Sequence, residues 1–352
     1  MSRQIRHLPL HLWPAADGTA FKKAFLTGDI FDDTAGPGAH LTEGTRICIE
    51  MVYRRWLGFL AAHHPDDLRL KPAERITTQR IGQFIANLEP TNRATSIHTT
   101  IERLCWAARL IDPQNNWFWF KGIVRKLAAR AKPMDRFDKL VPSWQTLDLG
   151  IELMDGAGSL ARTDHRAREL QYRDGLIIGL LSLWPIRRRS LAALTIDRHV
   201  MTDTDGITLL LHPEDTKSNR EESFRVPDIL TGYMQHYLDE IRPLLLRQDH
   251  HTALWVSYQG GPIAGGQIYT MVRRRCNARF DKAMCLHDFR RAAATFLATE
   301  APDKIGLIPG VLQHLSPDVA DQHYNLSRSA EASRRHGATI ARMRKHLPRG
   351  AR

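Results

Sequence analysis

A histidine and an arginine stand three residues apart in the second half of the chain, at His287 and Arg290, and the small residues Ala292 to Ala294 follow them. Positions i and i+3 share one face of a helix, so both side chains can point at a single target. Arginine stays protonated and donates two hydrogen bonds from a planar fork, which suits an anionic oxygen acceptor. A solvated helix face carries the same spacing, so this pair alone does not decide between a site and a surface.

Three more side chains could take part in catalysis, but each of them alone also has an ordinary structural explanation. Lys217 lies between Thr216 and Ser218 in a polar segment, where a lysine also serves as a solubilising residue. His314 follows Gln313, and a histidine at a helix end can act simply as a C-cap. Tyr324 could equally be a half-buried aromatic residue at a helix end.

A run of three arginines, Arg187 to Arg189, lies between two apolar segments, Ile177–Leu183 and Leu191–Leu194. Both flanking segments favour burial, which draws the arginines toward the edge of a core. An arginine at such an edge costs free energy unless an anion accepts its hydrogen bonds. We therefore expect at least one arginine of the run to bind an anion.

The order of these residues along the chain resembles the catalytic series of the tyrosine recombinase (phage integrase) family. The matching positions are Arg187, Lys217, His287, Arg290, His314 and Tyr324. The motifs cover roughly residues 145–330, and a helical DNA-clamping domain precedes the catalytic domain in that family. The sequence departs from the family pattern at Pro185-Ile186, at Ser190 where a glutamate is common, and at Gln313 where a glycine is common. These departures leave Arg188 as the alternative first arginine.

The resemblance implies a metal-free transesterification of DNA. Tyr324 would attack a phosphodiester and form a covalent 3′-phosphotyrosine, while Arg187 and Arg290 hold the non-bridging oxygens. His287 and His314 would donate hydrogen bonds or move protons. Lys217 would protonate the leaving 5′ oxygen. Tyrosine has an ordinary pKa near 10, and a cationic pocket would lower the cost of forming the phenolate. No cofactor is expected, and no acidic cluster of the kind that binds Mg²⁺ stands in the sequence.

Composition agrees with a nucleic-acid partner. The chain of 352 residues carries 50 Lys and Arg against 38 Asp and Glu, a net charge of +12. A charge of this size favours a polyanion, and DNA first. The four cysteines lack the paired spacing of a disulfide framework or zinc site. No apolar run approaches the roughly 20 residues of a membrane span, and no signal-type apolar core begins the chain, so a cytoplasmic protein with no membrane association is expected.

Periodicity predicts a mostly α protein with two domains. The first is expected to be all helical, and the second a mixed α+β, mainly helical domain with a small β-hairpin. By the family resemblance, the first is the core-binding, DNA-clamping domain and the second is the catalytic domain. The hairpin strands are predicted at Ile207–His212 and Phe224–Pro227. The expected divisions are an irregular arm at 1–40, the clamping domain at 41–131, a linker at 132–142, the catalytic domain at 143–328 and a basic tail or helix at 329–352.

One helix of the clamping domain, expected from about Trp117 to Ala131, has a basic outer face. The DNA-binding residues predicted on it are Lys121, Arg125, Lys126 and Arg130. By the family resemblance, double-stranded DNA is the partner and four protomers assemble on paired sites. The sequence leaves open the target site, any accessory protein, and whether the tail docks on its own protomer or on a neighbour.

Three alternatives stay open at the level of sequence. A type IB topoisomerase uses a similar set of residues but reseals the same strand. An architectural DNA-binding protein would carry the same residues without catalysis. A metal hydrolase would need His63-His64 or His250-His251, but adjacent side chains point apart on a helix or strand, which disfavours that interpretation.

Overall fold

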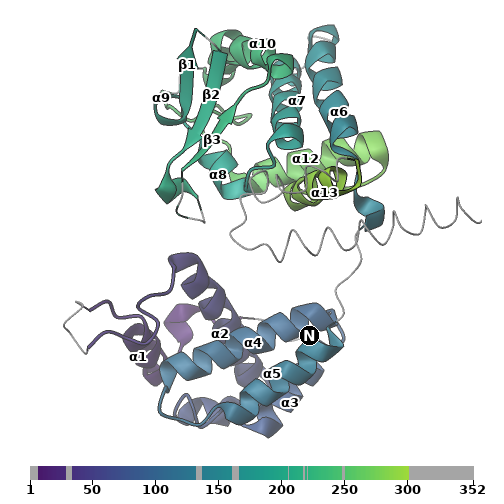
Figure 1. Cartoon of the computed structure of the whole chain (residues 1–352). Coiled ribbons are helices and arrows are strands. Elements are labelled where there is room, and N and C mark those ends of the chain that lie inside the picture. The colour runs from purple at the N-terminus through teal and green to yellow at the C-terminus, as the bar shows by residue number, and fades with distance from the viewer. Residues whose placement is uncertain are drawn as a thin grey trace, which may run out of the picture. The chain divides into compact units, whose positions relative to one another are not determined.

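The computed structural model describes residues 7–28, 34–131, 137–160, 166–204, 206–216, 219, 221–247 and 250–300. The chain divides into two compact units, Met1–Asp135 and Arg136–Arg352 (Figure 1). The boundary falls inside the stretch 132–142 in which the sequence loses its periodicity. Each unit has its own hydrophobic core. No helix in the described ranges is both long enough and apolar enough to cross a bilayer.

The first unit is built from helices alone in its described part. Its elements are the short 3-10 turns η1 (Leu10–Leu12) and η2 (Pro65–Arg69) and the helices α1 (Ala15–Ala24), α2 (Glu43–His63), α3 (Thr78–Leu88), α4 (Ala94–Ile111) and α5 (Phe118–Arg130).

The beginnings of two of these helices follow from single capping residues. The Thr42 hydroxyl accepts a hydrogen bond from the Thr45 backbone N–H at 3.4 Å at the start of α2, and Thr77 accepts one from Arg80 N–H at 3.2 Å at the start of α3. Such caps satisfy backbone donors that the first helical turn leaves without intrahelical partners. Helix α4 ends at Ile111, because the residue before Pro113 is disfavoured in helical conformation.

The structure differs from the sequence prediction at the N-terminus, where an irregular arm was expected over residues 1–40. Helix α1 lies within that range, and Phe21 on it and Phe25 just after it are buried in the core of the first unit. Leu8 is buried in the same core. Besides Phe21 and Phe25, the buried face of this segment carries only the small Ala24 and the acid Asp17, so the apolar pattern is too weak to establish a helical period.

The second unit begins with η3 (Phe137–Lys139) and contains three strands among its helices. Its other elements are α6 (Ser143–Asp155), η4 (Gly156–Ser159), α7 (Ala167–Leu183), α8 (Arg188–Ala193), α9 (Ile196–His199), β1 (Val200–Asp203), β2 (Gly206–Leu211), η5 (Pro213–Asp215), β3 (Glu222–Arg225), α10 (Asp228–His236), the π-helical η6 (Tyr237–Ile241), α11 (Arg242–Leu246), α12 (Gly265–Phe280) and α13 (Leu286–Glu300).

Helix α7 is the centre of the second unit. Every residue from Tyr172 to Ser182 is buried, as expected for a helix that other elements surround. Helices α6 and α7 lie side by side (Figure 1). A Cβ atom at Gly175 would stand 2.5 Å from the carbonyl oxygen of Gly150, so this close approach requires glycine.

The three strands form an antiparallel sheet in the order β1-β2-β3, and the predicted hairpin corresponds to β2 and β3. Leu209 of β2 is paired with Val200 on one side and Phe224 on the other. Alternate β2 residues (Ile207, Leu209 and Leu211) are buried, which fixes the register of the strand. The mostly helical fold with a small β element is thus confirmed, with β1 as an additional strand.

Candidate active site

Arg187 stands at the N-cap position of α8, directly after the buried residues Pro185 and Ile186. Leu191, one turn into α8, is buried in the core of the second unit and holds the short helix in place. The Arg187 side chain is 26% exposed, and its Nη1 lies 3.9 Å from Oε1 of Glu222, the first residue of β3. Arg187 therefore sits at the edge of the core, as its sequence context predicts.

Arg290 approaches the same place from α13. It is only 6% exposed, and its Nη1 donates a hydrogen bond to the carbonyl oxygen of Pro185 at 2.5 Å. Burial first, and then the positive charge of Arg187, lower the pKa of Arg290 to about 10, while the Glu222 carboxylate opposes both effects. The guanidinium therefore stays protonated at neutral pH. Two arginines that are about a hundred residues apart in sequence meet around one carboxylate and one backbone carbonyl.

His287 lies one turn before Arg290 and is exposed. The start of α13 is fixed by Asp288, whose Oδ2 accepts a hydrogen bond from Cys285 N–H at 2.9 Å. Leu286 and Phe289 are buried on the core side of this turn. The burial of these neighbours leaves the imidazole at the surface, on the same helix as the buried guanidinium of Arg290.

Arg188, the alternative first arginine, is exposed and has different surroundings. Its side chain lies where a Cβ at Gly265 would come within 3.3 Å, so it packs against the beginning of α12. Of the two arginines, Arg187 is the one that neighbours Arg290.

Three predicted site residues, Lys217, His314 and Tyr324, lie outside the described residues, as does the predicted tail at 329–352. The described chain approaches Lys217 through Asp215 and the buried Thr216.

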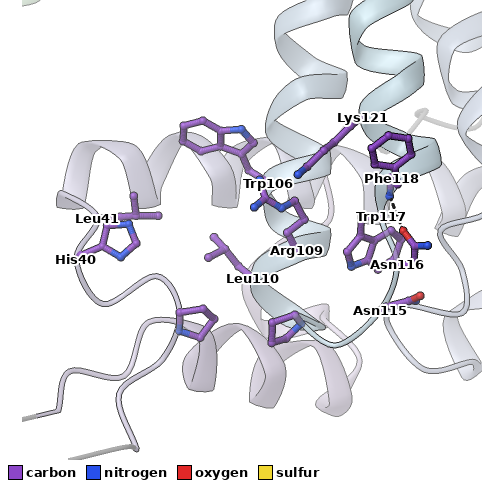
Figure 2. Close-up of a pocket in the computed structure, with 12 residues that line it drawn as sticks. His40, Leu41, Trp106, Arg109, Leu110, Asn115, Asn116, Trp117, Phe118 and Lys121 are labelled. Atoms are coloured by element: carbon purple, nitrogen blue, oxygen red, sulfur yellow. Dashed lines mark hydrogen bonds between the residues drawn. The ribbon is translucent and has the colours of Figure 1, made fainter. Parts of the chain in front are cut away.

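The predicted DNA-binding residues are all on α5 of the first unit. The four side chains are exposed, as a phosphate-contacting face requires: Lys121, Arg125, Lys126 and Arg130. At the beginning of α5 lies a surface pocket of about 520 Å³. Figure 2 shows Lys121 and Arg109 beside the aromatic rings of Trp106 and Phe118 in this pocket. Phe118 is 70% exposed, so the basic face of α5 continues into an aromatic one.

Sequence reasoning missed Glu222, which lies beside Arg187, and also Asp215 and His199, which bind each other. Asp215 accepts a hydrogen bond from the buried His199 at 3.1 Å. An acid or a histidine in a short polar segment carries no pattern that identifies its partner. In the described ranges, no three His, Cys, Asp or Glu side chains are grouped so that they could hold a metal ion.

Comparison with known proteins gives matches at low sequence identity. No protein-family model matches the chain. The chain is similar to tyrosine recombinase XerD of Chlorobaculum tepidum, with 26% identity over 114 residues that cover 32% of this chain and 37% of that protein. It is also similar to the XerD proteins of Staphylococcus saprophyticus (22% identity, 49% of this chain, 56% of that protein) and Staphylococcus epidermidis (21% identity, 55% of this chain, 61% of that protein). The chain thus spans 37% to 61% of the length of these relatives.

Solved structures share the fold. The XerH site-specific recombinase bound to a palindromic difH substrate, in a post-cleavage complex, has a TM-score of 0.57 at 14% identity, covering 82% of this chain and 78% of that one. Its pre-cleavage complex has a TM-score of 0.55 at 15% identity, covering 90% of this chain and 94% of that one. A lambda integrase fragment bound to a core site has a TM-score of 0.50 at 17% identity, covering 82% of this chain and 90% of that one. The predicted resemblance to the tyrosine recombinase family is therefore confirmed in sequence similarity and in fold.

Proposed function

We propose that the chain is a site-specific tyrosine recombinase that cleaves and rejoins double-stranded DNA. The observation that carries the proposal is the meeting of Arg187 and Arg290 around the Pro185 carbonyl and Glu222. Bringing two guanidiniums together is electrostatically unfavourable, and an anionic phosphate that both contact would offset the repulsion. His287, exposed on the same helix as Arg290, supplies a proton donor or acceptor for the same anion.

In the proposed reaction the Tyr324 phenolate oxygen attacks the phosphorus, and the bond from phosphorus to the 5′ oxygen breaks. Arg187, Arg290 and the two histidines, His287 and His314, stabilise the charge that develops on the non-bridging oxygens; a preorganised donor of this kind contributes about 3 kcal/mol. Lys217 gives its proton to the departing 5′ oxygen. A 5′-hydroxyl then attacks the phosphotyrosine and regenerates the tyrosine, so the phosphodiester energy is conserved.

The DNA would lie on the basic face of α5 in the first unit and over the arginine site in the second. Exchange of strands between two duplexes requires a protomer for each strand that is cut, so the proposal includes a homotetramer on paired sites. A type IB topoisomerase would share the covalent step and differ in which strand it reseals.

A nicked suicide duplex tests the proposed function. On such a substrate the short 5′-hydroxyl fragment diffuses away after cleavage, so the covalent protein–DNA complex accumulates and is visible as a shifted band on a denaturing gel. Tyr324→Phe, which removes only the hydroxyl, is expected to abolish the adduct and to retain DNA binding. The matched control is Tyr258→Phe, at an exposed tyrosine of the same unit, which should leave the adduct at its normal level.

Two results decide the identity of the enzyme. An adduct that persists in Tyr324→Phe would show that Tyr324 is not the nucleophile. Transfer of the trapped strand to a new duplex selects the recombinase, whereas resealing confined to the original strand selects the topoisomerase.

A further inference from the structure

The Asp215 carboxylate, two residues before Lys217, has several partners. Asp215 closes the η5 turn, and one oxygen of its carboxylate, Oδ2, lies 3.1 Å from His199 Nε2, 3.3 Å from Arg198 Nη2 and 3.3 Å from the backbone N–H of His212. Burial raises the pKa of Asp215, but the hydrogen bond from His199 and the charge of Arg198 outweigh it, so the pKa lies below its ordinary value. The carboxylate is therefore ionised at neutral pH.

His199 is arranged to donate to this carboxylate. The ring is 2% exposed, and its Nδ1 accepts a hydrogen bond from the Thr195 backbone N–H at 2.9 Å. A neutral imidazole that accepts at Nδ1 carries its proton at Nε2, which is the atom facing Asp215. The backbone at the start of α9 thus selects the tautomer that binds the carboxylate.

A second bond connects Asp215 to the helix of the first arginine. The hydroxyl of Ser190 donates to the backbone carbonyl of Asp215 at 2.9 Å. Ser190 lies three residues after Arg187, in α8, and is buried. This serine occupies the position at which the family resemblance leads one to expect glutamate, and here it ties α8 to the turn that precedes Lys217.

We propose that Asp215, held by Ser190 and His199, is a positioning residue that sets the place of Lys217 relative to Arg187. The proposal rests on the proposed function, in which Lys217 protonates the leaving oxygen. A general acid must come within hydrogen-bond reach of the atom it protonates, so small displacements reduce the rate steeply. Lys217 follows Asp215 by two residues, which leaves little chain to absorb a shift of the anchor.

The experiment compares two DNA substrates, one ordinary and one with sulfur as the 5′-bridging atom. Sulfur leaves as a thiolate and needs no proton, so a defect in the general acid disappears on the sulfur substrate. Asp215→Asn and Ser190→Ala are expected to slow cleavage of ordinary DNA by about 10- to 100-fold, part of the range that proton transfer contributes. On the sulfur substrate both variants should cleave within a few-fold of the unaltered protein. Ser190→Ala removes a single hydroxyl and decides the matter if Asp215→Asn fails to fold.

Two control variants are measured on the same two substrates. Asp203→Asn makes the same change of acid to amide at the end of strand β1, at a 56% exposed side chain paired with Arg225 at 3.3 Å, and should cleave both substrates normally. Lys217→Ala should lose its rate on ordinary DNA and recover it on the sulfur substrate. The positioning role of Asp215 would be wrong if Asp215→Asn and Ser190→Ala lost the same fraction of the cleavage rate on both substrates while Lys217→Ala regained its rate on the sulfur substrate. That result would leave Lys217 as the general acid. No recovery by Lys217→Ala would overturn the role of Lys217, and the anchor with it.

Discussion

Each unit of the molecule contains an arginine paired with a carboxylate near its core, and the two pairs are built differently. In the first unit, Arg75 and Asp17 are 1% and 0% exposed, and Arg75 Nη1 lies 2.8 Å from both carboxylate oxygens. In the second unit, Arg187 is 26% exposed and stands 3.9 Å from Glu222. The first pair is closed to solvent, and the second is open to it.

Other hydrogen-bonding groups of the Arg75–Asp17 pair also have partners within the first unit. The Nε and Nη2 groups of Arg75 donate to the carbonyl oxygens of Leu68 and Leu70, and the Tyr53 hydroxyl donates to Asp17 at 2.6 Å. An arginine in such a cage can only join segments of the chain, here α1, α2 and the segment before α3. In the second unit, Arg290 joins the Arg187–Glu222 pair to form an open cluster of three side chains. This open cluster carries two cations and one anion. That imbalance, next to solvent, suits one phosphate.

The largest expected effect comes from breaking the closed pair. Asp17→Asn leaves the Arg75 guanidinium buried without its counter-charge, which should cost the first unit about 3–5 kcal/mol of unfolding free energy. Hydrogen exchange of the α2 amides, read by mass spectrometry, measures this loss. Asp66→Asn is the control, because that acid is 88% exposed and its pair with Arg69 should contribute less than about 1 kcal/mol. Unchanged protection of α2 in Asp17→Asn would show that the closed pair does not hold the unit together.

The open cluster should respond in rate rather than in stability. Arg290→Lys keeps a positive charge but loses the fork, and we expect cleavage to fall by about 10²-fold, the low end for one preorganised donor. The burial and the Arg187 charge that lower the pKa of Arg290 to about 10 act in the same direction on a lysine, whose ordinary pKa is about 10.4. A cation with a lower pKa loses its proton at a lower pH, so the deficit should grow as pH rises.

The measurement is the ratio of the variant cleavage rate to the unaltered rate from pH 7 to pH 9, in which ionisations shared by both proteins cancel. Urea unfolding of both proteins reports stability. A constant ratio across that range would mean that the environment of Arg290 does not lower the pKa of a cation. A loss of stability as large as that of Asp17→Asn would remove the distinction between the two clusters.

The two clusters also show which parts of this molecule could be predicted from sequence. Local signals account for the bounds of several helices, since Thr42 and Thr77 cap the helices that follow them and Pro113 accounts for the end of α4. Strand β1 could not be predicted, because three of its four residues are exposed and no alternation marks it. Helix α1 is held by Asp17, whose partner Arg75 is 58 residues away.

The candidate site likewise contains some residues that the sequence predicts and others that it does not. Arg187 and Arg290 could be predicted because their order along the chain resembles a known series, and the structure brings the two together. Their partner Glu222 and the anchor at Asp215 depend on which segments the fold brings together, and a single sequence does not contain that information. The places of Lys217, His314 and Tyr324 stay predictions.

The smallest effect is expected from cations that neither cluster uses. Lys121, Arg125, Lys126 and Arg130 are exposed on α5, so they would act on DNA through released counterions and not through a built pocket. Changing all four to glutamine should leave folding intact and flatten the dependence of log K on log salt by about 0.9 for each phosphate that the variant no longer neutralises. The slope is measured by fluorescence anisotropy with a labelled duplex at several salt concentrations.

The control replaces four other exposed cations of the first unit, Lys22, Lys23, Arg69 and Lys71. The two sets remove the same charge, so a general field effect would lower affinity equally in both, and only the α5 set should reduce the slope if DNA lies on that face. An equal change in both sets would mean that α5 contributes charge without touching the DNA directly, and an unchanged slope in the α5 set would place the DNA on another face of the unit.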